Sequence, residues 1–118
     1  MKTKILFISA LLCALWSNGQ KVDAQELADY QNNLMIEKLD LSEVQVEQVK
    51  VHNAKYAEKQ AELMNREGSM FGKIGDVKRM KKARNAALEK ILSPTQMEVF
   101  EDEVAPALSK HMRKKMMG

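Results

Sequence analysis

Apolar residues recur every three or four positions through most of the chain beyond residue 23, and no stretch alternates apolar with polar side chains. This spacing is typical of helices that bury one face. Ala, Leu, Met, Glu, Lys and Gln, which favour helices, dominate the composition. The pattern predicts an all-α fold of four helices, over about 24–38, 43–67, 77–91 and 94–109, with residues 110–117 as a fraying continuation of the last.

Each predicted helix has one stripe of residues that we expect to face the core, and a few polar residues share these stripes. In chain order the stripe residues are Leu27, Tyr30, Leu34 and Met35; Val46, Val49, Asn53, Tyr56, Gln60 and Leu63; Val77, Met80, Arg84, Ala87, Leu88 and Ile91; Met97, Phe100, Val104 and Leu108.

The expected helix boundaries depend on a few capping and helix-breaking residues. Asp23 is a candidate N-cap for the first helix, and Gly68 suits the position after the second. Three glycines within 68–75 predict a loop, after which Asp76 would cap the third helix. Pro106 lacks a backbone donor and should kink or interrupt the fourth helix.

A five-residue motif, Leu-Ser-x-x-Gln, occurs twice, at the start of the second helix and at the start of the fourth. It predicts a capping box, in which the serine hydroxyl accepts from the backbone N–H three residues later and the glutamine accepts from the serine N–H. The leucine before each serine can pack on the residue after the glutamine. The motif residues are Leu41, Ser42, Gln45, Leu92, Ser93 and Gln96.

These two copies resemble the paired Leu-Thr-x-x-Gln motifs of the Spy/CpxP family of periplasmic proteins, with serine in place of threonine. The resembling region covers about 27–108. The resemblance implies an elongated, hairpin-type four-helix fold that pairs into an antiparallel, cradle-shaped homodimer. A monomeric four-helix arrangement is the alternative that the residues leave open.

The same resemblance implies a function. Members of the family act as ATP-independent chaperones that hold unfolded or misfolded clients during envelope stress, and they are not enzymes. Related members are periplasmic stress or metal sensors, or regulators that bind a membrane sensor kinase. We take the chaperone-like function as the first expectation and the sensor or regulator function as the alternative.

The beginning of the chain has the layout of a cleaved secretory signal. Residues 1–19 carry two lysines, an apolar run over 5–15 and small residues at the positions that precede a cut after Gly19. We therefore expect a signal peptide over 1–19, a single helical domain over 20–118 and a periplasmic location.

Cys13, the one cysteine, offers an alternative as a lipoprotein anchor, but the large Leu12 before it disfavours that cleavage. Cleavage after Gly19 would leave a mature chain without thiol or disulfide chemistry. The apolar run over 5–15 is shorter than the roughly 20 residues that span a membrane, so no membrane insertion is expected after cleavage.

Charge is concentrated in the segment 73–90, which carries seven basic and two acidic residues. Its functional interpretation is a surface that attracts acidic unfolded clients, aided by nearby apolar side chains. The alternatives are a solvated face that pairs with the acids of 98–103, and apolar residues that plug the end of the hairpin. Neither the charge pattern nor the secretory signal favours a nucleic-acid partner. The candidate client-binding residues are Met70, Phe71, Lys73, Ile74, Lys78, Arg79, Met80, Lys81, Lys82 and Arg84.

Candidate metal ligands and catalytic groups are few. His111, Met112 and Met116 are soft ligands near the end of the chain, but four basic residues within 104–118 oppose a cation. His52 lacks a partner at ligand spacing. No nucleophile with a base, phosphate-binding glycine loop or zinc motif is found, so we expect no cofactor and no catalysis.

Overall fold

The computed structural model describes residues 21–117, so the predictions of a signal peptide over 1–19 and of a lipid anchor at Cys13 lie outside the described residues. The described part is all-α, as predicted, and contains no strand. Its elements are α2 (Ala24–Leu39), α3 (Glu43–Asn65), α4 (Met70–Glu89), α5 (Pro94–Val99), the π-helical segment η1 (Phe100–Val104) and α6 (Ala105–Met117).

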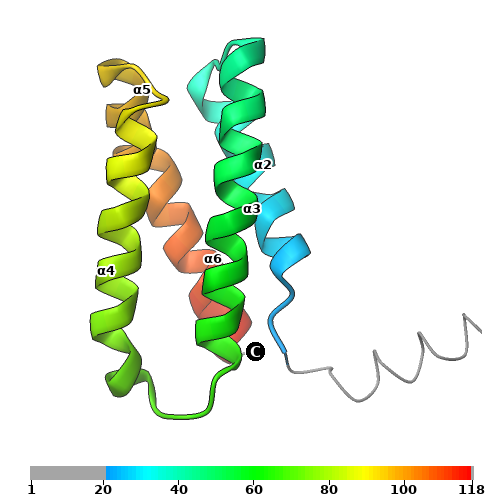
Figure 1. Ribbon diagram of the computed structural model, residues 1–118, viewed down its shortest axis with the longest axis vertical. Helices are drawn as coiled ribbons and strands as arrows, with labels where there is room; N and C mark the ends of the chain where they lie inside the picture. Colours follow the sequence, from blue (N-terminus) through cyan, green and yellow to red (C-terminus); the bar gives the residue numbers. More distant parts are fainter. Residues whose placement is uncertain (1–20, 118) are drawn as a thin grey trace, which may run out of the picture.

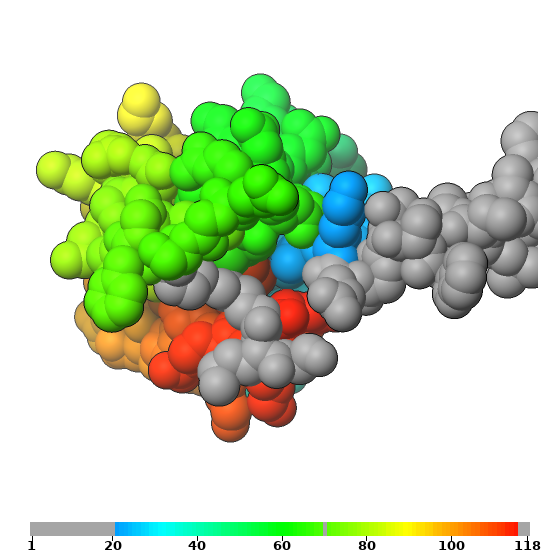
Figure 2. Space-filling model, turned by 90° about the horizontal axis from the view of Figure 1, so that it is seen from below, coloured from blue at the N-terminus to red at the C-terminus, as the bar shows by residue number. Residues whose placement is uncertain are grey.

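The four helical stretches run up and down beside one another (Figure 1). α2 and α3 form an antiparallel pair, and α4 follows α3 through a short turn at the lower end. α5, η1 and α6 form one helical run that passes behind α3 and α4. Seen from the end where α3 turns into α4, α6 lies on the side opposite α3 and α4 (Figure 2). None of the described helices is both long and apolar enough to cross a membrane.

Both repeated motifs form the predicted capping boxes. The Ser42 hydroxyl accepts from the Gln45 N–H at 3.1 Å, and the Gln45 side chain accepts from the Ser42 N–H at 3.0 Å. Ser93 and Gln96 repeat this arrangement at 3.1 Å and 2.9 Å. Each serine therefore begins a helix, α3 in one case and α5 in the other.

The predicted core faces are largely confirmed. One apolar cluster lies beside the two capping boxes, and a second lies between α2 and α3, where alanines let the two helices approach closely. Two polar members of the α3 stripe are buried because α2 supplies partners: Asn53 donates to Asn32, and Gln60 accepts from Gln31. The first cluster consists of Met35, Leu39, Val49, Leu88, Leu92, Met97, Phe100, Val104 and Leu108.

The start of the third helix was predicted wrongly. α4 begins at Met70, because the Ser69 hydroxyl accepts from the Gly72 N–H and caps it, so most of the loop expected over 68–75 is helical. Asp76 lies inside α4 and is not its N-cap. α3 already ends at Asn65, and Gly68 has a positive φ of 125° within the connection. The three glycines favoured a loop prediction for a segment that is helical because Ser69 caps it.

Pro106 does not end the last helix. The Ala105 N–H bonds to the Phe100 carbonyl, five residues back, which makes the turn before the proline a π-helical one. The helix continues to Met117, the end of the continuation that we expected over 110–117. The π turn rearranges the hydrogen bonds around the N–H that Pro106 lacks. The predicted interruption is therefore a local widening of the helix and not a break.

Candidate functional site

The structure divides most of the predicted client-binding residues between two adjoining faces of α4. Phe71, Ile74, Lys78 and Lys82 follow one another at spacings of three, four and four residues, so they share one face. Phe71 is 86% exposed and Ile74 42%. We call these four residues the outer stripe. The alternative that Phe71 and Ile74 plug the end of the hairpin is therefore wrong.

The lysines of the outer stripe are not neutralised by neighbouring acids. Among the described residues, no carboxylate lies within 4.0 Å of Lys78 or Lys82. No ion pair joins α4 to Glu98, Glu101, Asp102 or Glu103, and Glu103 instead pairs with Lys38 of α2 at 3.9 Å. The outer stripe is therefore solvated, as the alternative expected, but the expected close ion pairs with these acids do not form; Glu101 acts on Arg84 only from a longer distance.

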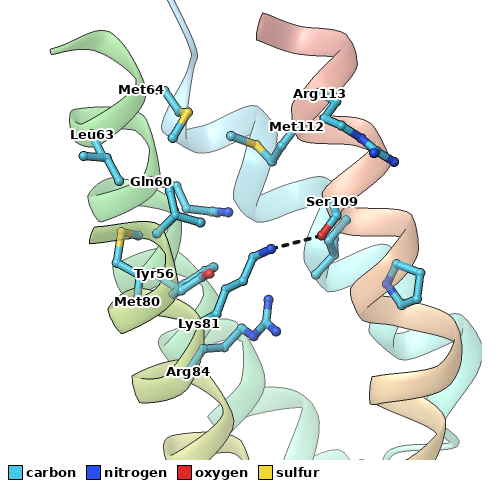
Figure 3. A pocket seen from close by; sticks show the side chains of 13 residues that line it. Tyr56, Gln60, Leu63, Met64, Met80, Lys81, Arg84, Ser109, Met112 and Arg113 are labelled. Atoms are coloured by element: carbon cyan, nitrogen blue, oxygen red, sulfur yellow. Dashed lines mark hydrogen bonds between the residues drawn. The ribbon is translucent and has the colours of Figure 1, made fainter. Parts of the chain in front are cut away.

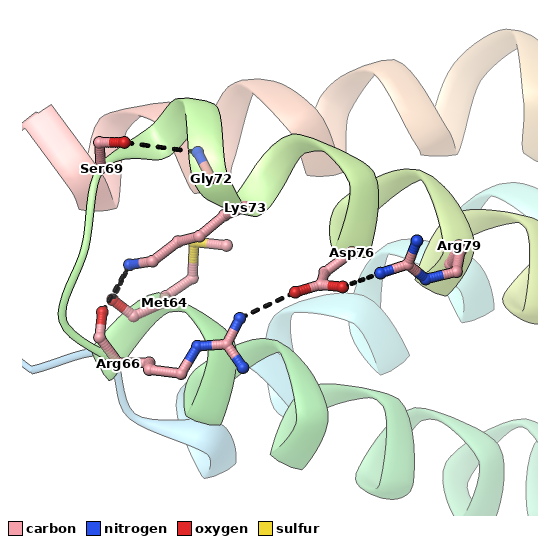
Figure 4. A network of polar contacts seen from close by, with 7 residues as sticks. All are labelled: Met64, Arg66, Ser69, Gly72, Lys73, Asp76 and Arg79. Atoms are coloured by element: carbon pink, nitrogen blue, oxygen red, sulfur yellow. Dashed lines mark hydrogen bonds and ion pairs between the residues drawn. The ribbon is translucent and has the colours of Figure 1, made fainter.

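Lys73 does not belong to a client-binding surface. Its side chain is buried and turns back toward α3, where its ammonium group donates to the carbonyls of Arg66 at 2.6 Å and Met64 at 3.4 Å (Figure 4). These carbonyls lie at the end of α3, where helix carbonyls lack partners of their own. The prediction that Lys73 binds clients is therefore wrong, because this side chain caps the C-terminus of α3.

Arg79 is exposed but is not free. It pairs with Asp76, which also accepts from Arg66 at 2.8 Å, so one carboxylate joins the end of α3 to the beginning of α4 (Figure 4). The hydrogen bond from Arg66, followed by the interactions with Arg79, holds the pKa of Asp76 below its usual value. The side chains of Met70 and Met116, two further predicted residues, lie outside the described part.

Met80, Lys81 and Arg84 line an open cleft of about 400 Å³ between α3, α4 and α6 (Figure 3). We call it the α4–α6 cleft. Its lining is largely apolar and holds three methionines, and it contains no acidic side chain. The lining residues are Tyr56, Gln60, Leu63, Met64, Val77, Met80, Lys81, Arg84, Pro106, Leu108, Ser109, Met112 and Arg113.

Arg84 lies at the inner wall of the α4–α6 cleft and is only 7% exposed. Its guanidinium carbon is 4.9 Å from the ring centre of Phe100 and 5.6 Å from that of Tyr56. Its Nε donates to Asn85 at 3.1 Å. Burial lowers the pKa of Arg84. Two aromatic rings, one amide and the more distant charge of Glu101 thus stabilise a cation that forms no ion pair within residues 21–117.

Lys81 reaches across the mouth of the cleft and donates to the Ser109 hydroxyl of α6 at 3.3 Å (Figure 3). Burial, followed by the charges of Arg84 and Arg113, lowers the pKa of Lys81. Sequence reasoning missed Arg113, because it lies in a segment expected to fray. A signal was available in the sequence: Met112 lies one helical turn after Leu108 and so continues the predicted core face, and Arg113 is the next residue.

The candidate metal ligands have other contacts. His111 lies 3.2 Å from a Glu26 oxygen and stacks on Tyr30, with ring centres 3.8 Å apart. Met112 lines the α4–α6 cleft. His52 stacks on Tyr56, and its buried Nε2 has no hydrogen-bond partner. Within residues 21–117, no three His, Cys, Asp or Glu side chains gather as metal ligands.

Two surfaces therefore stand out: the outer stripe of α4, and the α4–α6 cleft on the adjoining face. No family model, no curated protein and no solved structure matches this chain. The functional interpretation depends on these two surfaces and on the resemblance of the paired motifs.

Proposed function

We propose that this protein is a periplasmic, ATP-independent chaperone-like protein that holds unfolded clients on the outer stripe of α4. The observation that carries the proposal is the exposure of Phe71 and Ile74 at one end of a helix face whose next members are two lysines that form no ion pair within the described residues. An exposed phenylalanine contributes little to the stability of the fold, and exposed apolar side chains that lie together are typical of surfaces that bind partners.

The order of residues along the outer stripe suggests how a client would bind. Unpaired lysines attract acidic chains over a distance that salt shortens. Apolar segments of the client would then cover Phe71 and Ile74 and remove apolar surface from water. A surface of this kind holds a chain without selecting one sequence, and it needs no nucleotide.

The paired motifs support the same proposal. Their two serines begin α3 and α5 as the Spy/CpxP resemblance requires, and the periplasmic location follows from the predicted signal peptide. An antiparallel homodimer is part of the proposal. Val44 and Val51, which lie seven residues apart on one face of α3, are 67% and 58% exposed, and they are the residues that a second copy would cover.

The test uses the mature chain, residues 20–118, mixed with an aggregating acidic client and followed by light scattering. We expect suppression at low salt that weakens as salt is added. Phe71→Ser with Ile74→Ser should remove most of it, and Lys78→Gln with Lys82→Gln should slow capture. Lys50→Gln with Lys55→Gln, at exposed sites of α3, is the charge-matched control. Equal suppression by the wild type and the serine variant would contradict the proposal, provided that circular dichroism shows both folded.

A further inference from the structure

The α4–α6 cleft combines an apolar wall with clustered positive charge. Leu63 and Met64 of α3, Met80 of α4 and Met112 of α6 contribute apolar surface. Lys81, Arg84 and Arg113 contribute the charge, and no carboxylate belongs to the lining. The volume of about 400 Å³ lies within the range of small-molecule sites.

The three cations form no ion pair within the described part of the chain, although the charge of Glu101 acts on Arg84 from further away. None of them is within 4.0 Å of a carboxylate. Lys81 donates to the neutral hydroxyl of Ser109, and Arg84 donates to the amide of Asn85 and lies over two aromatic rings. Charges of one sign repel each other most strongly where water is partly excluded, so an anion placed among these three would be stabilised by all of them.

From this arrangement we infer that the α4–α6 cleft binds a free alkyl carboxylate, with its carboxylate at Lys81, Arg84 and Arg113 and its chain along the methionines. Methionine side chains suit this role because they are flexible and adapt to an unbranched chain. The inference goes beyond client holding, since it uses other residues of α4 and a small ligand.

The test is a calorimetric titration of the mature chain with dodecanoate below its micelle concentration. We expect saturable binding of one equivalent. Dodecyl maltoside and dodecyltrimethylammonium, which carry the same chain with a neutral or a positive head, should bind at least tenfold more weakly. Equal affinity for all three heads would overturn the inference, because it would show that the cations play no part.

Variants at the cleft give a second measurement. Lys81→Gln and Arg113→Gln each remove one exposed charge and should weaken dodecanoate binding about fivefold to tenfold. Lys114→Gln, next to Arg113 but absent from the lining, and Lys90→Gln, at the end of α4, are matched controls and should bind as the wild type does. An equal loss in the controls would mean general charge attraction and would overturn the inference.

Two other occupants can be distinguished. Lysophosphatidylglycerol offers a chain with a phosphate head, and binding of this lipid without dodecanoate would overturn the assignment to a free carboxylate. A second copy of the chain would appear as a dimer in sedimentation that Arg113→Gln dissociates, with no uptake of dodecanoate, and would also overturn it. Failure here leaves client holding untouched, because Phe71 and Ile74 are not part of the cleft.

Discussion

The side-chain amides of Gln45 and Gln96 bond to each other in both directions. The Gln45 amide nitrogen donates to the Gln96 oxygen at 2.7 Å, and the Gln96 nitrogen donates to the Gln45 oxygen at 3.0 Å. Each nitrogen also donates to a backbone carbonyl at the end of another helix: Gln45 to Ile91, and Gln96 to Leu39 and Asp40. The two repeated motifs therefore form one junction that connects all four helical stretches.

This junction should be cooperative. Gln45→Ala and Gln96→Ala each leave partners unsatisfied in a half-buried place, and each should lower the free energy of unfolding by about 1–3 kcal/mol. The double variant should lose less than the sum, by about 1 kcal/mol or more, because one change already breaks the shared pair. Urea unfolding of the four proteins measures the coupling, with Gln48→Ala as an exposed control on α3. Strict additivity would show that the pair does not act as a unit.

Lys73 should stabilise the turn between α3 and α4. Lys73→Met keeps most of the buried stem but removes the donor to the carbonyls of Met64 and Arg66, and we expect a loss of about 1–2 kcal/mol. Hydrogen exchange of the amides near Asn65 should accelerate more than exchange in α2. Lys50→Met, on an exposed site, should change neither quantity; an equal loss in that control would contradict the capping role.

Glu26 should make the docking of α6 depend on pH. Burial alone would raise the pKa of its carboxyl, but hydrogen bonds from Lys115 and His111 together with their charges outweigh burial and hold the pKa below 4.5. The resulting stability is present above the usual carboxyl pKa and is lost as the pH falls through the lowered value. Since Glu26 and Lys115 are partly exposed, the effect should be small.

The measurement is the urea midpoint of the wild type and of Glu26→Gln at neutral pH and below about pH 4. The two midpoints should differ at neutral pH and converge in acid. Glu37→Gln, at an exposed site of α2, should follow the wild type throughout. A difference between Glu26→Gln and the wild type that is the same at both pH values would rule out the ion pairs as its cause.

Two substitutions of Arg84 distinguish its effect on folding stability from its effect on ligand binding in the cleft. Arg84→Met keeps the packing on Tyr56 and Phe100 while removing a buried charge without a carboxylate, so stability should stay within about 1 kcal/mol of the wild type. Arg84→Ala should lose about 2 kcal/mol or more because it opens a cavity. Dodecanoate binding should fall in both. A loss as large in Arg84→Met as in Arg84→Ala, measured by urea unfolding, would show that the charge itself stabilises the fold.

The helices and their buried faces were predictable because they depend on local spacing. Leu27 and Phe100 are each recognised as core from neighbours a turn away, and Ser42 and Ser93 mark their helix starts within five residues. The start of α4 was harder, since Ser69 precedes glycines that also favour loops. This one capping residue decides the outcome.

The site was predictable only in part. Lys73 and Lys78 are alike in sequence, yet one is buried against the end of α3 and the other faces solvent, because the turn between the helices is short. Arg113 and Arg84 line the same cleft because α6 runs alongside α4. The direction of α6 cannot be read from the local sequence pattern. Which residues share a helix face follows from spacing, whereas which faces meet depends on the tertiary arrangement.

The π-helical turn at Phe100–Val104 determines what faces the cleft. Phe100, Val104, Leu108 and Met112 repeat every four residues, a step that drifts by about 40° around a regular helix. Because the wide turn accommodates an additional residue, winding the same residues as a regular α-helix would put the downstream segment one residue out of register. It would rotate the downstream segment by about 100° and carry Met112 and Arg113 away from α4. In this protein the composition of one wall of a binding cleft is therefore fixed by the length of a turn that never touches a ligand.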